Sequence, residues 1–138
     1  MDSLPRQMLL VGEDLARQKP ALDVLAQWGV PAEVAPSGAQ ALEVVAQGAF
    51  DLILIDVIRS VLDGLFVITR LRNLERQRPG MPPAALVVRV PKPRLTYEAP
   101  LRPAGVDDVL SLAGAGAAVN ECLLRWRAGQ YRASQAEV

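Results

Sequence analysis

A carboxylate at the end of an apolar run is the first residue of this sequence that could do chemistry. Asp56 follows residues 52–55, four apolar residues without alternation, which is the pattern of a strand buried on both faces. In open parallel sheets, ligands and chemistry gather where the strands end. A turn at Asp63 and Gly64 follows, and a helical pattern begins after it. Residues 50–64 therefore predict a strand that delivers a carboxylate to a functional edge of a sheet.

Two more acids follow an earlier apolar run. Glu13 and Asp14 come just after residues 8–11, so we expect them at the end of a first strand. Carboxylate oxygens suit a hard divalent cation such as Mg²⁺, and Asp56 would complete such a site. The alternative is that Glu13 and Asp14 are solvated loop acids.

A basic segment follows a further apolar run at residues 84–90. Guanidinium groups fork onto phosphates and stack on bases, so an anionic ligand such as cyclic di-GMP, or a protein partner, would suit it. The alternative is an exposed loop whose charges are solvated. The predicted ligand-binding or partner-binding residues are Arg89, Lys92, Arg94, Tyr97 and Arg102.

Composition limits the classes of function. The chain has 138 residues and contains no histidine, which removes histidine bases, serine triads and most zinc sites. Its 15 basic and 15 acidic residues give zero net charge, which argues against DNA binding. No apolar run approaches the ~18 residues of a membrane span, and no signal sequence is evident, so we expect a cytoplasmic protein without membrane insertion. The single Cys122 has apolar neighbours and indicates plain packing.

The elements that must position these residues alternate along the chain. Strands are predicted at residues 8–11, 31–35, 52–55, 84–90 and within 106–112, with helices between them that end at Gly29, at Gly48 and near residue 76. The third helix is expected to begin near residue 65, and a last helix follows Gly114. This order predicts an α/β fold with a doubly wound, five-stranded parallel sheet.

Three details of this organisation are less regular. Residues 89–103 contain four prolines, so we expect the fourth helix to be shortened, or replaced by an irregular Pro-rich connection with at most one short turn. Residues 1–7 form an extension, residues 8–128 the domain, and residues 129–138 a polar tail that frays. Gln18 and Lys19 are expected on an exposed helix face, and Trp126 in the core.

The motifs resemble the receiver domain of bacterial response regulators, and most of all the receivers of hybrid histidine kinases. In those receivers V-E-D-N-P-V-N-Q-K follows the first strand, and residues 11–19 here read V-G-E-D-L-A-R-Q-K. The family's D-V-x-M-P-x-M-D-G corresponds to D-V-I-R-S-V-L-D-G at residues 56–64. Its D-D-Y-L-S-K-P corresponds to D-D-V-L-S-L-A at residues 107–113. The resemblance implies the CheY-like, flavodoxin-like fold and a place in two-component signalling.

The family's chemistry is phosphoryl transfer from a phosphohistidine to the aspartate that ends strand three, here Asp56. That reaction uses an acid pair that helps hold Mg²⁺, a lysine after strand five and a Ser or Thr after strand four. These positions map here to Gly12 with Glu13, to Leu112 and to Val88. Losing one charge-stabilising donor typically costs ~2–4 kcal/mol of transition-state stabilisation. The sequence therefore predicts a degenerate receiver, or pseudo-receiver, with slow phosphoryl transfer.

Three functions follow from this resemblance, and none is an enzyme. The first is a phosphorylation-independent interaction module for a histidine kinase or another signalling protein. The second is a sensor that binds cyclic di-GMP through residues 89–103, and the third is a conventional phosphoacceptor at Asp56 in a phosphorelay. The interpretation we favour for Asp56 is an inherited carboxylate that is no longer phosphorylated, with its pKa raised near Glu13.

Overall fold

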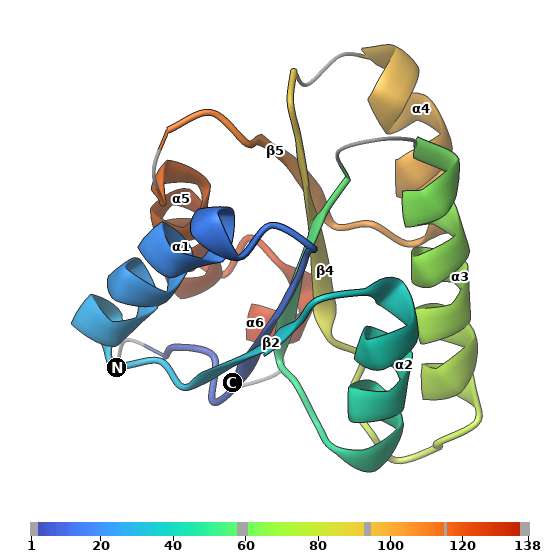
Figure 1. The fold of residues 1–138 in the computed structure, drawn as a ribbon. Coiled ribbons are helices and arrows are strands. Elements are labelled where there is room, and N and C mark those ends of the chain that lie inside the picture. Colours follow the sequence, from blue (N-terminus) through green and yellow to red (C-terminus); the bar gives the residue numbers. More distant parts are fainter. Residues whose placement is uncertain (1–2, 58–60, 93–94, 115, 136–138) are drawn as a thin grey trace.

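The chain folds around one parallel sheet of five strands in the order β2-β1-β3-β4-β5. The computed structural model describes residues 3–57, 61–92, 95–114 and 116–135. The strands are β1 (Met8–Val11), β2 (Ala32–Ala35), β3 (Leu52–Asp56), β4 (Ala85–Val90) and β5 (Asp108–Ser111). The helices are α1 (Leu15–Trp28), α2 (Gly38–Gln47), α3 (Val61–Arg76), α4 (Leu95–Ala104), α5 (Ala117–Arg127) and α6 (Arg132–Gln135). The predicted fold class is confirmed, because helices cover both faces of an all-parallel sheet (Figure 1).

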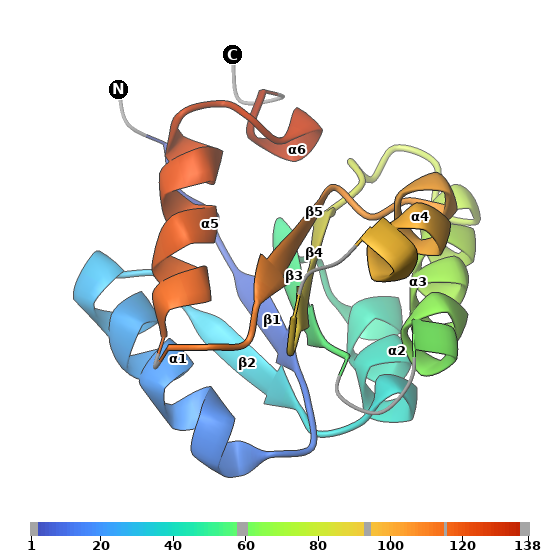
Figure 2. The same cartoon turned by 90° about the horizontal axis from the view of Figure 1, so that it is seen from above.

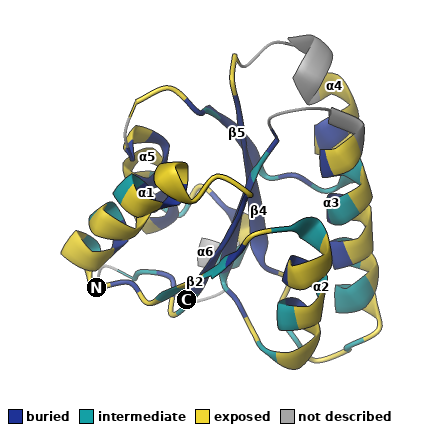
Figure 3. Ribbon diagram, viewed as in Figure 1, coloured by how far each residue is buried: buried dark blue, intermediate teal, exposed yellow. Residues whose placement is uncertain are grey.

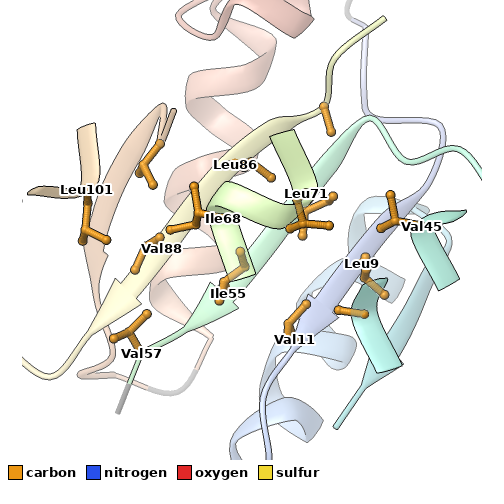
Figure 4. Packing of buried hydrophobic residues seen from close by; sticks show 14 of the residues in the cluster. Leu9, Val11, Val45, Ile55, Val57, Ile68, Leu71, Leu86, Val88 and Leu101 are labelled. Atoms are coloured by element: carbon orange, nitrogen blue, oxygen red, sulfur yellow. The ribbon is translucent and has the colours of Figure 1, made fainter. Parts of the chain in front are cut away.

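The sheet divides the core into two layers. Every residue of β1 and of β4 is buried, and the apolar runs predict this for all of them except Arg89 of β4. Alternate side chains of the strands point to opposite faces: Ile53 and Ile55 pack with α2 and α3, whereas Leu52 and Leu54 pack with α1 and α5. Figure 3 shows the buried strands between mostly exposed outer helix surfaces, and Figure 4 shows the first of these two layers.

The helix ends follow the capping residues in the sequence. Asp14 caps α1 by accepting a hydrogen bond from the backbone N–H of Ala16 at 3.0 Å, and Ser37 caps α2 through the N–H of Gln40 at 3.2 Å. Gly29 ends α1 in the left-handed conformation at φ 74°, which an L side chain adopts only with strain. These caps fix where the chain leaves β1 and β2, and so shape the edge of the sheet where the strands end.

Two predicted connections are wrong in the structure. The third helix begins at Val61, four residues before the predicted start. Residues 95–104 form the helix α4 in place of an irregular Pro-rich connection, although Pro100 and Pro103 lie inside it. Each proline removes one backbone donor. The helix forms nonetheless, because Leu101 is fully buried in the core layer beside α3. Tertiary packing of one side chain here outweighs unfavourable local propensity.

The C-terminal segment does not begin to fray at residue 129, contrary to the prediction. Tyr131 is 3% exposed and packs in the core layer with α5. Its hydroxyl donates a hydrogen bond of 2.7 Å to Asp108 at the start of β5, and the short helix α6 follows. No helix in the described ranges is long and apolar enough to cross a membrane.

Candidate functional site

A cleft of about 400 Å³ opens where β1 and β3 end and α2 begins. The acids predicted to do chemistry are part of its wall, together with apolar side chains from both strands. The lining residues are Val11, Gly12, Glu13, Asp14, Pro36, Ser37, Gly38, Ile55, Asp56, Val57, Asp63, Gly64 and Val67. The structure therefore brings Asp56 to the same edge of the sheet as Glu13 and Asp14, as the strand order requires.

Asp56, which lines this cleft, is bound to Arg89 in a bidentate ion pair. The Nε atom of Arg89 donates to Oδ1 of Asp56 at 2.6 Å, and Nη2 donates to Oδ2 at 2.8 Å. The two residues are register partners on adjacent strands, so their side chains leave the same face of the sheet side by side. The Asp56 side chain is 1% exposed and the Arg89 side chain is 4% exposed. Both oxygens of the carboxylate are therefore engaged by a cation from within the chain.

Burial sets the protonation behaviour of Asp56. Desolvation raises the pKa of the Asp56 carboxyl above its ordinary value, and the Arg89 guanidinium opposes that rise through its hydrogen bonds and charge. The sequence predicted a raised pKa but attributed it to Glu13. Burial disfavours the charged form of this carboxyl, and Arg89 is the group that favours it most.

Gln18 fills the space next to this ion pair. It was predicted on an exposed helix face, but only 2% of it is exposed, and its Oε1 accepts a 3.4 Å hydrogen bond from Nη2 of Arg89. A Cβ atom on Gly12 would lie 2.4 Å from Nε2 of Gln18 and 2.9 Å from Oδ2 of Asp56. The structure thus has no room for an acid at residue 12. Lys19 lies on the exposed face as expected and pairs with Asp23 at 3.1 Å.

The acids of the cleft do not fit the divalent cation that the resemblance implies. Asp14 uses Oδ1 to cap α1 and Oδ2 to pair with Arg17 at 3.2 Å, while Arg89 engages both oxygens of Asp56. Among the described residues, no three acids or cysteines are grouped so that they could hold a metal ion. Two members of the predicted metal set of Glu13, Asp14 and Asp56 are therefore engaged by other partners, and the set stays a prediction.

The hydroxyl position of the family belongs to Arg89 in this fold and not to Val88. A side chain that contacts a group on Asp56 must leave the same face of the sheet as Asp56. Val88 points to the opposite face, into the core layer with α3, whereas Arg89 is the register partner of Asp56. Leu112, at the lysine position after β5, is buried. A single arginine on strand four thus supplies a cation where the family uses a lysine after strand five.

The predicted basic segment is divided by the fold. Arg89 is buried, so it does not belong to a surface cluster, whereas Lys92 is exposed. The Arg102 side chain is 50% exposed and donates to the backbone oxygen of Asp107 at 3.4 Å. Arg94 and the side chain of Tyr97 lie outside the described part of the chain. The cyclic di-GMP prediction therefore loses Arg89 as a ligand contact, since that guanidinium is already bonded to Asp56.

Sequence reasoning missed a second ionic network around Asp108. This carboxylate is 7% exposed and accepts hydrogen bonds from Arg125 at 2.5 Å, from Tyr131 at 2.7 Å and from the backbone N–H of Val109 at 3.0 Å. The spacing of Arg125 and Tyr131 carries no recognisable signal. Arg89, by contrast, could have been found: a charged residue inside a strand that is otherwise apolar must have a buried partner.

Comparison with known proteins agrees with the fold. No family model and no curated protein matches the sequence. Among solved structures, the Ssk1 receiver domain of Saccharomyces cerevisiae, crystallised with the histidine phosphotransfer protein Ypd1, is similar with a TM-score of 0.79, 20% identity and 94% of each chain covered. A CheY-like receiver from Methanospirillum hungatei is similar with a TM-score of 0.72 and 20% identity, and the match covers 93% of this chain and 97% of that chain.

A third solved structure has a magnesium ion in its active-site cleft. It is the receiver domain of a Pseudomonas aeruginosa sensor histidine kinase, with a TM-score of 0.71 and 23% identity, and the match covers 89% of this chain and 98% of that one. All three matched structures are receiver domains. The present chain has the fold of the response-regulator receiver domains.

Proposed function

We propose that this chain is a receiver module of two-component signalling that acts through protein contacts without phosphorylation. The observation that carries the proposal is the bidentate pair of Arg89 with Asp56. In the family, the carboxylate attacks a phosphoryl group while a divalent cation binds next to it. Here a guanidinium covers both oxygens, so a nucleophilic attack by Asp56 must first break a buried ion pair.

Two features raise the barrier to phosphoryl transfer: the buried ion pair, and the loss of residues that the family uses for this reaction. Removing one partner from a buried ion pair costs about 3–5 kcal/mol. The absent charge-stabilising lysine, whose place Leu112 takes, adds ~2–4 kcal/mol to the barrier, and Gly12 removes an acid that in the family helps hold the divalent cation. Phosphoryl transfer to Asp56 is therefore slower than in a working receiver by several orders of magnitude, since each 1.4 kcal/mol is about a factor of ten.

The partner we propose is a histidine kinase, a histidine phosphotransfer protein or another signalling protein. Support comes from the fold, since a similar domain was crystallised with a phosphotransfer protein. A receiver fold that has lost its switch keeps its outer helices, which remain available for docking. Arg89 and Asp56 then have a structural role: they hold the ends of β3 and β4 together without any ligand.

Binding assays with and without a phosphodonor test this proposal. The chain is immobilised and titrated with the histidine kinases and phosphotransfer proteins of its source genome, in buffer with Mg²⁺ and with or without acetyl phosphate. We expect one partner whose affinity is the same in both conditions. Binding that appears only with acetyl phosphate, and is lost in Asp56→Asn, would refute phosphorylation-independent action. Failure of every kinase and phosphotransfer protein to bind would refute the partner class.

A pair of charge reversals tests the partner surface predicted from the basic segment. Lys92→Glu with Arg94→Glu should weaken binding at least about tenfold, because two attractive contacts become repulsive. The control is Lys19→Glu with Arg70→Glu, which changes the net charge equally on α1 and α3. Equal weakening in both variants would show that only the total charge matters and that the basic segment is not the docking surface.

A further inference from the structure

The chain turns back onto the domain after α5, the last long helix. Figure 2 shows α6 at the end of the sheet where β4 and β5 begin, opposite to the end that carries Asp56. We call residues 130–135 the strap. Its anchor is Tyr131, which is 3% exposed and whose hydroxyl donates to Oδ2 of Asp108 at 2.7 Å. A short segment is thus fastened to the domain through a buried side chain.

Gly129 makes the turn between α5 and the strap. Its φ of 75° is in the left-handed region, which glycine adopts without the strain that a Cβ atom brings. The turn has the two hydrogen bonds of a Schellman motif. The backbone N–H of Gly129 donates to the oxygen of Trp126 at 2.9 Å. The N–H of Gln130 donates to the oxygen of Arg125 at 3.0 Å. Rotation at Gly129 therefore releases the strap and leaves α5 unchanged.

Few side chains hold the strap in place. Among its described side chains only Tyr131 is buried, while Gln130 and Arg132 are exposed and Ala133 is partly buried. The helix α6 spans four residues, Arg132–Gln135, and a helix of this length is not stable by itself in water. Closure of the strap therefore depends mainly on the burial of one aromatic ring, and loss of that contact frees the whole segment.

Asp108 keeps its charge paired when the strap leaves. This carboxylate also accepts hydrogen bonds from Arg125 at 2.5 Å and from the backbone N–H of Val109 at 3.0 Å, and neither donor belongs to the strap. The costly result of breaking a buried ionic network is an unpaired charge, which does not arise here. Opening of the strap loses the burial of one ring and one hydrogen bond, whereas unfolding of the domain exposes both core layers. Opening therefore requires less free energy than unfolding, and the sheet stays folded.

We infer that the strap opens as a unit about Gly129 while the rest of the domain stays folded, and that its closed form is an autoinhibitory contact. The ring of Tyr131 fills a space in the core layer with α5, which we call the socket and which has the Asp108 carboxylate at the hydroxyl end. Arg132 and Ala133 also form part of the wall of a second cleft of about 410 Å³. Opening empties the socket and removes that wall. Because the socket already holds a tyrosine, it fits the tyrosine side chain of a partner segment, and closure of the strap competes with that partner.

Native-state hydrogen exchange of the full chain tests whether the strap opens alone. The amide of Gln130 reports the closed turn, and the amides of β3 report unfolding of the domain. We expect Gln130 to be protected, but at least about a hundredfold less than β3, and its exchange to be independent of urea at low concentrations. Exchange of Gln130 only through global unfolding, or no protection of Gln130 at all, would overturn the inference.

Two glycine variants separate strap opening from a general loss of stability. Gly129→Val strains the closed turn but not the open one, so it should speed exchange at Gln130 at least about tenfold. Gly80→Val is the control, because Gly80 also has a left-handed φ, 93°, and a Cβ on either glycine would meet no atom within 4 Å. This control should leave exchange at Gln130 within about twofold of the wild type. Equal acceleration at Gln130 by both variants would show that this amide reports global unfolding and would overturn the inference.

Masking of the socket is tested with p-cresol, which has the phenol group of tyrosine, in a titration followed by amide spectra. Tyr131→Ala leaves the socket empty and should bind p-cresol at least about tenfold more tightly than the wild type, whose own strap competes for the site. Gly129→Val keeps every side chain of the socket, should also bind more tightly than the wild type, and remains a test if Tyr131→Ala does not fold. Failure of both variants to bind at millimolar p-cresol, or equally tight binding by the wild type, would overturn the inference.

Discussion

Replacing Arg89 by methionine isolates the charge of the central ion pair. Methionine retains most of the apolar stem, so packing against the sheet changes little. The variant leaves the Asp56 carboxylate without its two hydrogen bonds of 2.6 Å and 2.8 Å, at a site where the side chain is 1% exposed. Breaking a buried pair in this way costs about 3–5 kcal/mol. For a domain with a free energy of unfolding of about 5–15 kcal/mol, that is a large fraction of the total.

The loss in free energy of unfolding that Arg89→Met causes, its stability deficit, should depend on pH. Burial raises the pKa of Asp56 even with Arg89 present, and removing Arg89 removes the contributions that oppose the rise. A carboxyl with a raised pKa in the folded state favours folding at low pH, and that contribution is lost as the pH rises through the folded-state pKa. Asp56 has the higher pKa in the variant, so the variant loses more of this contribution to stability as the pH rises. Its deficit is therefore smallest near pH 4 and largest at about pH 8.

Urea denaturation followed by circular dichroism measures these free energies. The double variant Asp56→Asn with Arg89→Met has no charge at this site and should be more stable than Arg89→Met alone at about pH 8, since the unpaired carboxylate is gone. Lys19→Met, which breaks only the exposed pair with Asp23, should change stability by about 0.5 kcal/mol or less. A deficit of Arg89→Met below about 1 kcal/mol, or one that shrinks as the pH rises, would refute the account of a buried ion pair.

Three further predictions concern other sites of the fold. Gly12→Asp should lower the free energy of unfolding by about 1–3 kcal/mol, because its Cβ would lie 2.4 Å from Nε2 of Gln18. Adding Gln18→Ala should recover part of the loss. Equal denaturation midpoints for wild type and Gly12→Asp would contradict this. Tyr131→Phe should cost about 1–2 kcal/mol and speed amide hydrogen exchange in α6, because Asp108 loses a hydrogen bond, and unchanged exchange would show that the hydroxyl does not anchor the helix. Burial raises the pKa of Cys122 to about 12, so a thiol reagent at about pH 8 should modify it only after denaturation, and rapid modification of the native protein would be the contrary result.

The fold was predictable from the sequence because its strongest signals are local. The unbroken apolar run at residues 52–55 and the run at residues 84–90, which is apolar except for Arg89, identify buried parallel strands, and Gly29 marks the end of a helix. The fourth helix was not predictable in this way. Pro100 and Pro103 argue against a helix in the isolated segment, and only the burial of Leu101 against α3 reverses that preference.

The candidate site was predictable in its position but not in its contacts. The sequence placed Asp56 at the end of a central strand, which the structure confirms. It did not reveal that Arg89 is the register partner of Asp56, because strand register depends on how β3 and β4 pair, and these two residues are 33 positions apart in the sequence. The sequence comparison with the family was one residue out of register in strand four, so it placed the family's hydroxyl position at Val88. Successive residues in a strand face opposite ways, so that shift assigned Val88 to the face of Asp56, and Arg89 was counted with the basic segment.

Phosphorylation of Asp56 is the most direct test of the central claim. The purified chain is incubated with acetyl phosphate and Mg²⁺, and its intact mass is compared with that of a variant in which Arg89→Thr and Leu112→Lys return the side chains of the family. We expect the wild type to keep its unmodified mass, because Arg89 covers both oxygens of the carboxylate. A stable gain of one phosphoryl group in the wild type that disappears in Asp56→Asn would contradict the account.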